Sequence, residues 1–167
     1  RAHRDRAPYR IWVDHGWLTA TPGTRIDQQD VRDALIAAAA MFQLRQIGFD
    51  PWNAGNLPSD LQKDGFTEQQ IVEIPQTFLH MSGPSKEFEA DVLGGMVDAG
   101  GNPLMKWMVA NAVVQKDGKD NIQPIKKRSR GRIDGVVAFV MGRKLAITTV
   151  DDPDEASRYF EQHGLGL

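Results

Sequence analysis

The 167-residue sequence has no cysteine and no long apolar run. Without thiols it can form neither disulfides nor thiolate metal sites, which suits a reducing cytoplasm. A membrane-spanning helix needs about 20 apolar residues in succession, so we expect no membrane segment. Nothing near Arg1 resembles a secretory signal, and Arg1 stands where a start methionine would be. We therefore expect an internal piece of a longer protein.

Familiar site patterns are also missing. Gly118-Lys119 is not a phosphate-binding loop, because Val113 stands where that motif requires its first glycine, and we expect no ATP site. Three histidines lack a partner at metal-binding spacing and are interpreted as surface or packed residues: His15, His80 and His163. The four tryptophans are expected to be core or pocket walls: Trp12, Trp17, Trp52 and Trp107.

The composition is that of a globular domain, with 41% hydrophobic and 25% charged residues. Residues 1–167 have the length of one ordinary domain, and we expect a single one. The net charge is only −2, but residues 115–132 hold seven Lys or Arg and two Asp. One concentrated basic segment in a nearly neutral protein predicts a localised contact with a polyanion.

Hydrophobic spacing predicts the elements of the first half. Residues 1–10 are polar and Arg-rich, typical of a mobile lead-in, and residues 11–23 alternate loosely like a strand or hairpin. Asp27 and Asp30 resemble an N-cap pair before a helix whose apolar residues run from Val31 to Phe42. A short strand through Ile47 and Phe49 should end at Asp50-Pro51, because proline cannot continue a central ladder.

A second helix is predicted over residues 57–63, ended by Gly65, and a strand follows in "QIVEIP". Pro84 suits the first turn of a third helix whose apolar face carries Phe88, Val92 and Met96.

The segment after Asn102 begins as a helix and runs into a strand, and Asp117-Gly118 predicts a hairpin. A capped helical turn is expected after Asp151. The last long helix should bury one face, formed by Ile133, Val136, Val137, Val140 and Met141. Strands that alternate with helices predict an α/β domain with helices packed on a sheet.

Asp50 is the first candidate for chemistry. It ends a strand, and ligands of open α/β sheets collect beyond the carboxyl ends of strands. The alternative is a structural one, in which Asp50 forms an Asx turn or caps the next helix. Its position alone leaves both interpretations open.

Asp134 is the second candidate, in the first turn of the last helix, where the helix dipole favours a carboxylate. A purely dipole-complementing acid is the structural alternative. The residues just before it are Lys126, Lys127, Arg128, Arg130 and Arg132. Cations are unfavourable near a helix N-terminus, so their presence there indicates an external anion, unless the run is only a solvated loop.

Cations beside carboxylates are what an enzyme acting on phosphodiesters needs. The cations hold backbone phosphates, and the carboxylates hold a divalent metal at the scissile one. Carboxylate oxygens favour Mg²⁺ or Mn²⁺. We expect the five cations to contact phosphates without reading bases.

Four stretches, taken in order, resemble the C-terminal nuclease domain of the phage terminase large subunit, the DNA-packaging motor protein of tailed phages. They are "GWLTATPGTRID", "IGFDPWNAGNL", "GPSKEFE" and "NPLMKWMVANAVVQKDGKDNIQPIKKRSRGRIDGVVAFVMG". The resemblance covers most of the chain, and the last stretch is the most specific.

The resemblance implies an RNase H-like α/β fold with a central mixed β-sheet flanked by helices. It implies a two-metal endonuclease that cuts concatemeric double-stranded DNA, with Asp50 and Asp134 as catalytic metal ligands for Mg²⁺ or Mn²⁺. By it, the cations from Lys126 to Arg132 face the DNA backbone. The family's first acid and its ATPase domain should precede Arg1, since Asp14 lies in the wrong segment.

By the same resemblance, the partners are double-stranded DNA, the small terminase subunit and the portal protein. The location would be the cytoplasm of the infected or lysogenic bacterial host, in the virion assembly motor. Two alternatives remain. One is a structure-selective resolvase of the same fold, and the other is a non-catalytic DNA-docking module in which the acids only cap helices.

Overall fold

The computed structural model describes residues 5–24 and 26–149, except for the side chain of Asn53. In these ranges none of the helices is long and apolar enough to cross a membrane. The turn expected after Asp151 and His163 both lie outside them. The elements in chain order are α2 (Tyr9–Asp14), α3 (Gln28–Met41), β1 (Ile47–Phe49), η1 (Pro51–Asn53), α4 (Leu57–Lys63), η2 (Glu68–Gln70), β2 (Ile71–Glu73), α5 (Phe78–Leu93), α6 (Pro103–Asn111), β3 (Val114–Lys116), β4 (Ile122–Pro124) and α7 (Asp134–Thr149).

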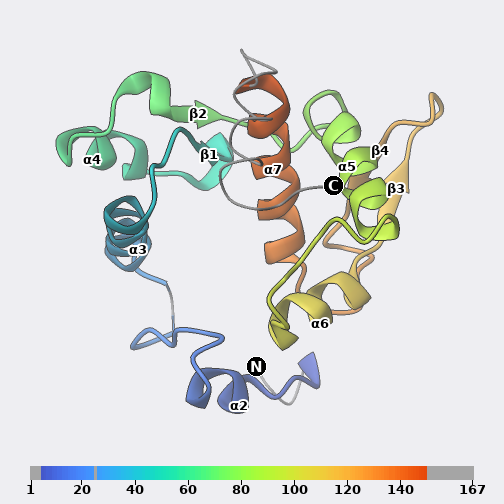
Figure 1. Cartoon of the computed structure of the whole chain (residues 1–167), viewed down its shortest axis with the longest axis horizontal. Coiled ribbons are helices and arrows are strands. Elements are labelled where there is room, and N and C mark those ends of the chain that lie inside the picture. Colours follow the sequence, from blue (N-terminus) through green and yellow to red (C-terminus); the bar gives the residue numbers. More distant parts are fainter. Residues whose placement is uncertain (1–4, 25, 150–167) are drawn as a thin grey trace.

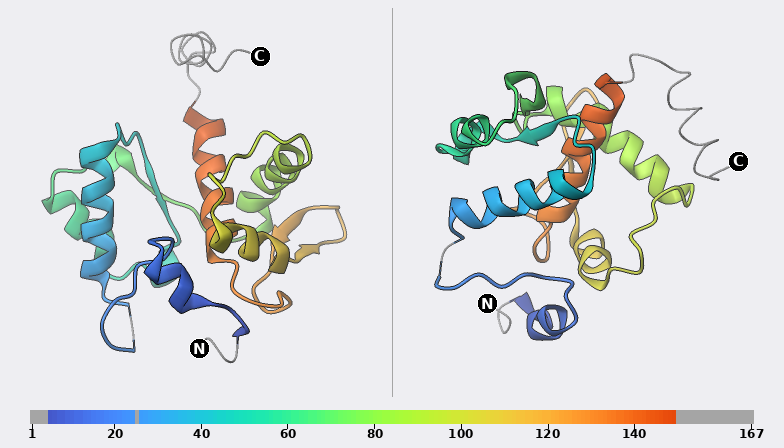
Figure 2. Two further views of the ribbon diagram at one scale, coloured as in Figure 1. Left: turned by 60° about the horizontal axis from the view of Figure 1, so that its bottom comes forward. Right: turned by 60° about the vertical axis from the view of Figure 1, so that its left-hand side comes forward.

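Helix α7 is the central element. It lies between the β1–β2 pair on one side and α5 and α6 on the other (Figures 1 and 2). The face predicted to be apolar is buried, and Val140 has no exposed surface. The core combines this face with side chains of α5 and the end of β2: Ile74, Met81, Phe88, Ile133, Val136, Val137, Val140, Met141 and Leu145. The prediction for the last helix is confirmed.

The strands form two separate small sheets in the described part of the chain. β1 pairs with β2 in parallel, with Ile47 opposite Ile71. β3 pairs with β4 in antiparallel fashion, with Val114 opposite Pro124, around the predicted hairpin turn. The structure thus has helices and small sheets, and one central mixed sheet is not present among these residues. The two pairs do not merge because α7 and α5 occupy the space between them (Figure 1).

Several local predictions are confirmed because short-range chemistry determines them. Asp27 caps α3 by accepting a hydrogen bond from the Gln29 backbone N–H at 3.0 Å. Strand β1 ends immediately before Asp50-Pro51. Helix α4 has the predicted bounds, and Gly65 follows it with a φ of +100°, a conformation that glycine adopts without strain.

The segment predicted as a strand or hairpin over residues 11–23 begins instead as helix α2, and that prediction is wrong. Trp12 is buried, and its ring packs 5.5 Å from Tyr9 and 5.4 Å from Trp107 of α6. Tyr9 belongs to the stretch expected to be a mobile lead-in, yet it joins this aromatic cluster. Long-range aromatic packing therefore overrides the local pattern.

Pro84 lies inside α5 rather than in its first turn, so this prediction is also wrong. The helix starts earlier, at Phe78, and ends at Leu93, so Met96 falls outside it. Proline interrupts the hydrogen-bond ladder of a helix, and tertiary packing must offset that cost. Pro84 is buried, and the neighbouring Ser82 Oγ accepts a hydrogen bond from the Ile122 N–H of β4 at 3.1 Å.

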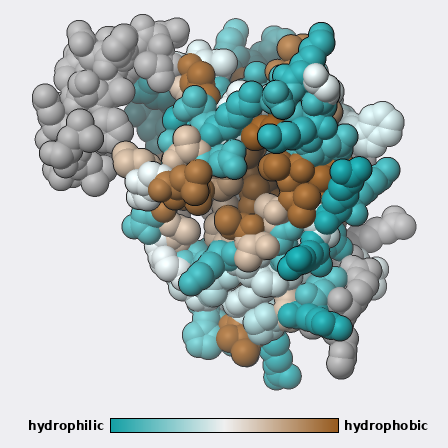
Figure 3. All heavy atoms as spheres, turned by 90° about the vertical axis from the view of Figure 1, so that its right-hand side faces the viewer, coloured by the Kyte–Doolittle hydropathy of each residue, from teal (hydrophilic) through white to brown (hydrophobic). Residues whose placement is uncertain are grey.

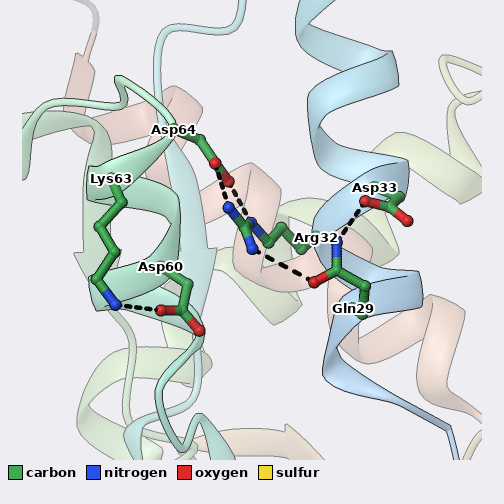
Figure 4. A network of polar contacts seen from close by, with 6 residues as sticks. All are labelled: Gln29, Arg32, Asp33, Asp60, Lys63 and Asp64. Carbon is green, nitrogen blue, oxygen red and sulfur yellow. Dashed lines mark hydrogen bonds and ion pairs between the residues drawn. The ribbon is translucent and has the colours of Figure 1, made fainter.

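A polar network fastens α3 to α4 (Figure 4). Arg32 donates two hydrogen bonds to the Asp64 carboxylate, and Gln29 accepts a third from Arg32 at 3.3 Å. The hydrogen bond from Arg32 is the main reason that the pKa of Asp64 is lowered. Lys63 pairs with Asp60 at 2.7 Å beside it. Polar contacts carry this junction because α3 has no buried residue.

An apolar hollow of about 220 Å³ opens between α5, α6 and the β3–β4 hairpin. Its walls include Phe88, Val92, Val109 and Val114. Figure 3 shows hydrophobic side chains gathered across this face within a hydrophilic rim. Val136 and Val140 of α7 are also among its lining residues, so the hollow lies beside the buried core.

We expect Gly48→Ala to destabilise the fold. A Cβ at Gly48 would lie 2.7 Å from Ile74 Cδ1 and 3.1 Å from Leu145 Cδ1, both in the core. Overpacking of this kind costs about 1–3 kcal/mol, measurable by urea unfolding. Gly142→Ala in α7 is the control, because nothing lies within 4 Å of its Cβ position, and it should stabilise by up to about 1 kcal/mol. Equal effects of the two substitutions would contradict the packing of β1 on α7.

Candidate functional site

Asp134 is the first residue of α7. Ile133 before it is 1% exposed and anchors the start of the helix, since its carbonyl accepts the Val137 N–H at 3.0 Å. The Asp134 side chain itself is 54% exposed, and its Oδ1 lies 2.8 Å from Lys126 Nζ. A buried neighbour thus fixes an accessible carboxylate at the positive end of the helix dipole.

A hollow of about 190 Å³ opens at Asp134 and contains two acids and two cations. Asp5 enters it from the start of the chain, accepting a hydrogen bond from Tyr9 OH at 2.8 Å. Arg132 Nε lies 3.9 Å from Asp5 Oδ2. Asp5 was not predicted as a site residue. The only hint in the sequence is that it is the single acid in the Arg-rich first ten residues. The hollow is lined by Asp5, Lys126, Gly131, Arg132, Ile133 and Asp134.

The basic loop, residues 126–132, is anchored to α6 and to the residues that flank the β3–β4 hairpin. Ser129 Oγ donates to the Ile125 carbonyl at 2.8 Å and accepts the Val113 N–H at 3.3 Å. Gly131 packs against α6 so closely that a Cβ there would lie 2.7 Å from Asn111 Nδ2 and 2.9 Å from Trp107 Cζ2. The backbone of this loop is therefore positioned by specific contacts.

All five cations of the basic loop are exposed. Two of them have acidic partners, Lys126 with Asp134 and Arg132 with Asp5. Within residues 5–24 and 26–149, no ion pair involves the other three: Lys127, Arg128 and Arg130. An anchored loop that presents unpaired cations to solvent suits an extended anion such as a nucleic-acid backbone.

Asp50 stands at the carboxyl end of β1, half-buried. Its Oδ1 accepts the Trp52 N–H at 3.1 Å and so caps η1, as the structural interpretation predicted. Trp52 is 88% exposed, so the expectation that it forms a core or pocket wall is wrong, whereas Trp12 is buried at 5%. A half-exposed carboxylate that uses one oxygen for a cap retains its second oxygen for a ligand.

The packing of β1 on α7 relates the positions of the two acids along the helix axis. Thr149 donates a hydrogen bond to Gln46, and Gly48 faces Leu145, so β1 runs antiparallel to α7. The chain therefore runs along β1 toward the end of α7 that carries Asp134, and Asp50 lies beyond the last residue of β1. From the rise of a strand and of a helix, about 10 Å of helix axis separates their levels. The two side chains share no hydrogen bond or ion pair among the described residues.

The donor chemistry of this pair fits a hard divalent cation. The part of the chain that the structure describes has no group of three or more His, Cys, Asp or Glu able to hold a metal ion. Mg²⁺, however, is commonly bound by one or two carboxylates together with waters and substrate phosphates. Asp134 already holds a cation, since the Lys126 ammonium lies 2.8 Å from it. The site thus offers two accessible carboxylates, one of them with a displaceable counter-ion.

A basic loop beside an acid at the start of a core helix suits a protein that acts on nucleic acid, and comparison with known proteins gives the class. The family model described as "Terminase large subunit, endonuclease domain" matches residues 1–148, and the chain belongs to this family. The predicted resemblance to a terminase nuclease domain is thereby confirmed, while its C-terminal position in the large subunit stays a prediction.

Two curated proteins are similar to the chain. The terminase large subunit of Enterobacteria phage HK97 is 35% identical over 141 residues, which are 84% of this chain and 28% of that protein. Protein YmfN of Escherichia coli (strain K12) is 30% identical over 159 residues, 94% of this chain and 34% of that protein. The chain therefore spans about a third or less of these relatives.

A solved structure is similar as well, the crystal structure of the HK97 bacteriophage large terminase. Its TM-score is 0.80 with 34% sequence identity, and the match covers 87% of this chain and 30% of that one. The arrangement of helices and small sheets described above is thus that of a terminase nuclease domain.

We expect Ser129→Ala to loosen the basic loop. The substitution removes two hydrogen bonds, worth about 1 kcal/mol each at most sites, without changing the charge. Limited trypsin digestion should cut within residues 126–132 about fivefold faster or more, because cleavage tracks local opening. Ser59→Ala, which removes an exposed hydrogen bond in α4, is the control. An unchanged digestion rate would show that Ser129 does not hold the loop.

Proposed function

We propose that the chain is the C-terminal nuclease domain of a phage terminase large subunit, a metal-dependent endonuclease that cuts concatemeric double-stranded DNA during packaging. The observation that carries the proposal is the position of Asp134. In a chain of the terminase endonuclease family, it stands at the start of the core helix, directly beside an anchored, exposed basic loop. A carboxylate in this place can hold a metal ion at the phosphate that the basic loop binds.

The basic loop binds the DNA backbone in this proposal. Its exposed cations contact phosphates, which position the duplex but carry no sequence information. The anchoring of Ser129 on Ile125 and Val113 keeps the loop in place beside α7. This arrangement suits a packaging nuclease, which acts on nearly any sequence.

Asp50 and Asp134 are the residues that would hold Mg²⁺ or Mn²⁺, as two ions. When bound, these ions would activate the attacking water and stabilise the leaving 3′ oxygen. The chain's own residues would do the rest: β1 and α7 would position the two carboxylates, and the basic loop would hold the duplex against them. A further carboxylate, expected upstream of Arg1, would complete the ligand set.

The same proposal covers the domain organisation, the partners and the location of the protein. Residues 1–167 form one RNase H-like domain, and an ATPase domain precedes it in the full-length protein. Its partners are double-stranded DNA, the small terminase subunit and the portal protein. The protein acts in the cytoplasm of an infected or lysogenic host, in the motor that fills the virion.

One observation favours a second candidate, a non-catalytic DNA-docking module. Asp50 caps η1 and Asp134 pairs with Lys126, so each acid has a structural role within the chain. In such a module the basic loop binds DNA, and the two acids take no part in cleavage. The two candidates differ in what happens when an acid is replaced by its amide.

We expect Asp50→Asn and Asp134→Asn each to lower plasmid cleavage by the full-length protein in Mn²⁺ by about 100-fold or more, the scale for losing one transition-state stabiliser. The amide at Asp50 can still accept the Trp52 N–H, so the cap survives. Asp30→Asn, which alters a first-turn acid of α3, is the matched control and should cut normally. Undiminished cutting by either amide variant would favour the docking module.

We expect the double variant Arg128→Glu with Arg130→Glu to bind unrelated duplexes equally weakly. Each lost phosphate contact lowers the slope of log K against log salt by about 0.9, so the slope should fall by about two units. A double variant of exposed lysines elsewhere, Lys86→Glu with Lys106→Glu, has the same charge change and should leave the slope nearly intact. If affinity is lost for one sequence only, or if the slope is unchanged, the basic loop is only a solvated surface segment that does not bind the DNA backbone.

A further inference from the structure

The two adjacent lysines of the basic loop are in different electrostatic situations. Lys126 Nζ lies 2.8 Å from Asp134 Oδ1, and both side chains are about half exposed. Lys127 is also exposed, but within the described ranges it takes part in no ion pair. Two cations of equal charge, one residue apart, are therefore not equally available to a phosphate.

The ion pair of Lys126 is also placed where it can be exchanged. Exposed ion pairs contribute little stability, because water competes for both charges. Lys126 neutralises the carboxylate to which a divalent cation would bind. A metal ion and the Lys126 ammonium therefore compete for one carboxylate.

The charge balance of the hollow determines the outcome of that competition. Among the described residues, four charged side chains line the hollow, Asp5, Lys126, Arg132 and Asp134, and their charges sum to zero. A divalent cation bound at Asp134 would make the hollow strongly positive and repel the ammonium of Lys126. The side chain would then turn to the nearest external anion, which is the DNA backbone beside the basic loop.

We infer that Lys126 is an exchangeable counter-ion that couples metal binding to DNA binding. In the metal-free protein it neutralises Asp134 and makes no phosphate contact. When a divalent cation binds Asp134, Lys126 moves to a phosphate, so that each ligand raises the affinity of the other. This inference rests on the proposed function and assigns Lys126 a role different from that of Lys127.

The test compares Lys126→Met with Lys127→Met in the full-length protein. Binding of a fluorescent duplex is measured against salt, once in EDTA and once in Ca²⁺, with the DNA checked to be intact. In EDTA, Lys126→Met should have the wild-type slope; in Ca²⁺ its slope should be smaller than that of wild type by about 0.9. Lys127→Met should lose about 0.9 in both conditions.

A second readout needs no DNA. Because Lys126→Met removes the competitor, Mn²⁺ should bind this variant roughly twofold to fivefold more tightly than wild type, as followed by electron paramagnetic resonance. Lys127→Met should bind Mn²⁺ as wild type does.

Two results would overturn the inference, and they are distinguishable. If Mn²⁺ binds in a manner that depends on Asp134, but Lys126→Met loses slope equally in EDTA and Ca²⁺, the coupling is wrong and the proposed function stands. If wild type has no Mn²⁺ site that depends on Asp134, both the coupling and the metal-dependent function fail.

Discussion

Burial of the apolar face of α7 is the interaction on which the rest of the structure depends. Val136, Val137 and Val140 are nearly inaccessible, and α5, α6 and β1 all pack against α7. Because α7 begins at Asp134, the same burial fixes the candidate acid and the loop that precedes it. It also fixes β1, whose Gly48 packs against Leu145 and whose end carries Asp50. Both acids are therefore positioned by the hydrophobic core rather than by each other.

The charges near the start of α7 show how such a core can support a polyanion site. Cations at a helix N-terminus oppose the dipole, and the structure offsets two of them with acids, Asp134 for Lys126 and Asp5 for Arg132. The remaining three face solvent on a loop held by Ser129 and Gly131. The unfavourable placement is explained if an external anion completes the arrangement.

The parts of the fold that could be predicted are those with a short-range cause. The buried face of α7 follows from helical spacing, the start of α3 from the Asp27 cap, and the β3–β4 turn from Asp117-Gly118. Helix α2 could not be predicted, because its burial depends on Trp107, far along the chain. Pro84 misled the prediction for α5, since packing on β4 offsets the missing hydrogen bond.

The candidate site, too, could be predicted only where local patterns determine it. Asp50, Asp134 and the basic loop could be selected from the sequence, because a strand end, a helix start and a charge run are local patterns. The contact of Asp5 with Arg132 joins segments far apart in the sequence, and no local pattern predicts it. Nor could spacing show that Lys126 is paired while Lys127 is not.

Metal-directed cleavage of the protein backbone tests most directly whether Asp50 and Asp134 share one metal site, as proposed. Fe²⁺ bound in place of Mg²⁺ generates hydroxyl radicals that cut the chain close to its ligands. With ascorbate and peroxide, the full-length protein should be cut near both residue 50 and residue 134, and Mg²⁺ should suppress both cuts. Asp50→Asn or Asp134→Asn should abolish both together. Cleavage near one acid that persists when the other is replaced would contradict a shared site.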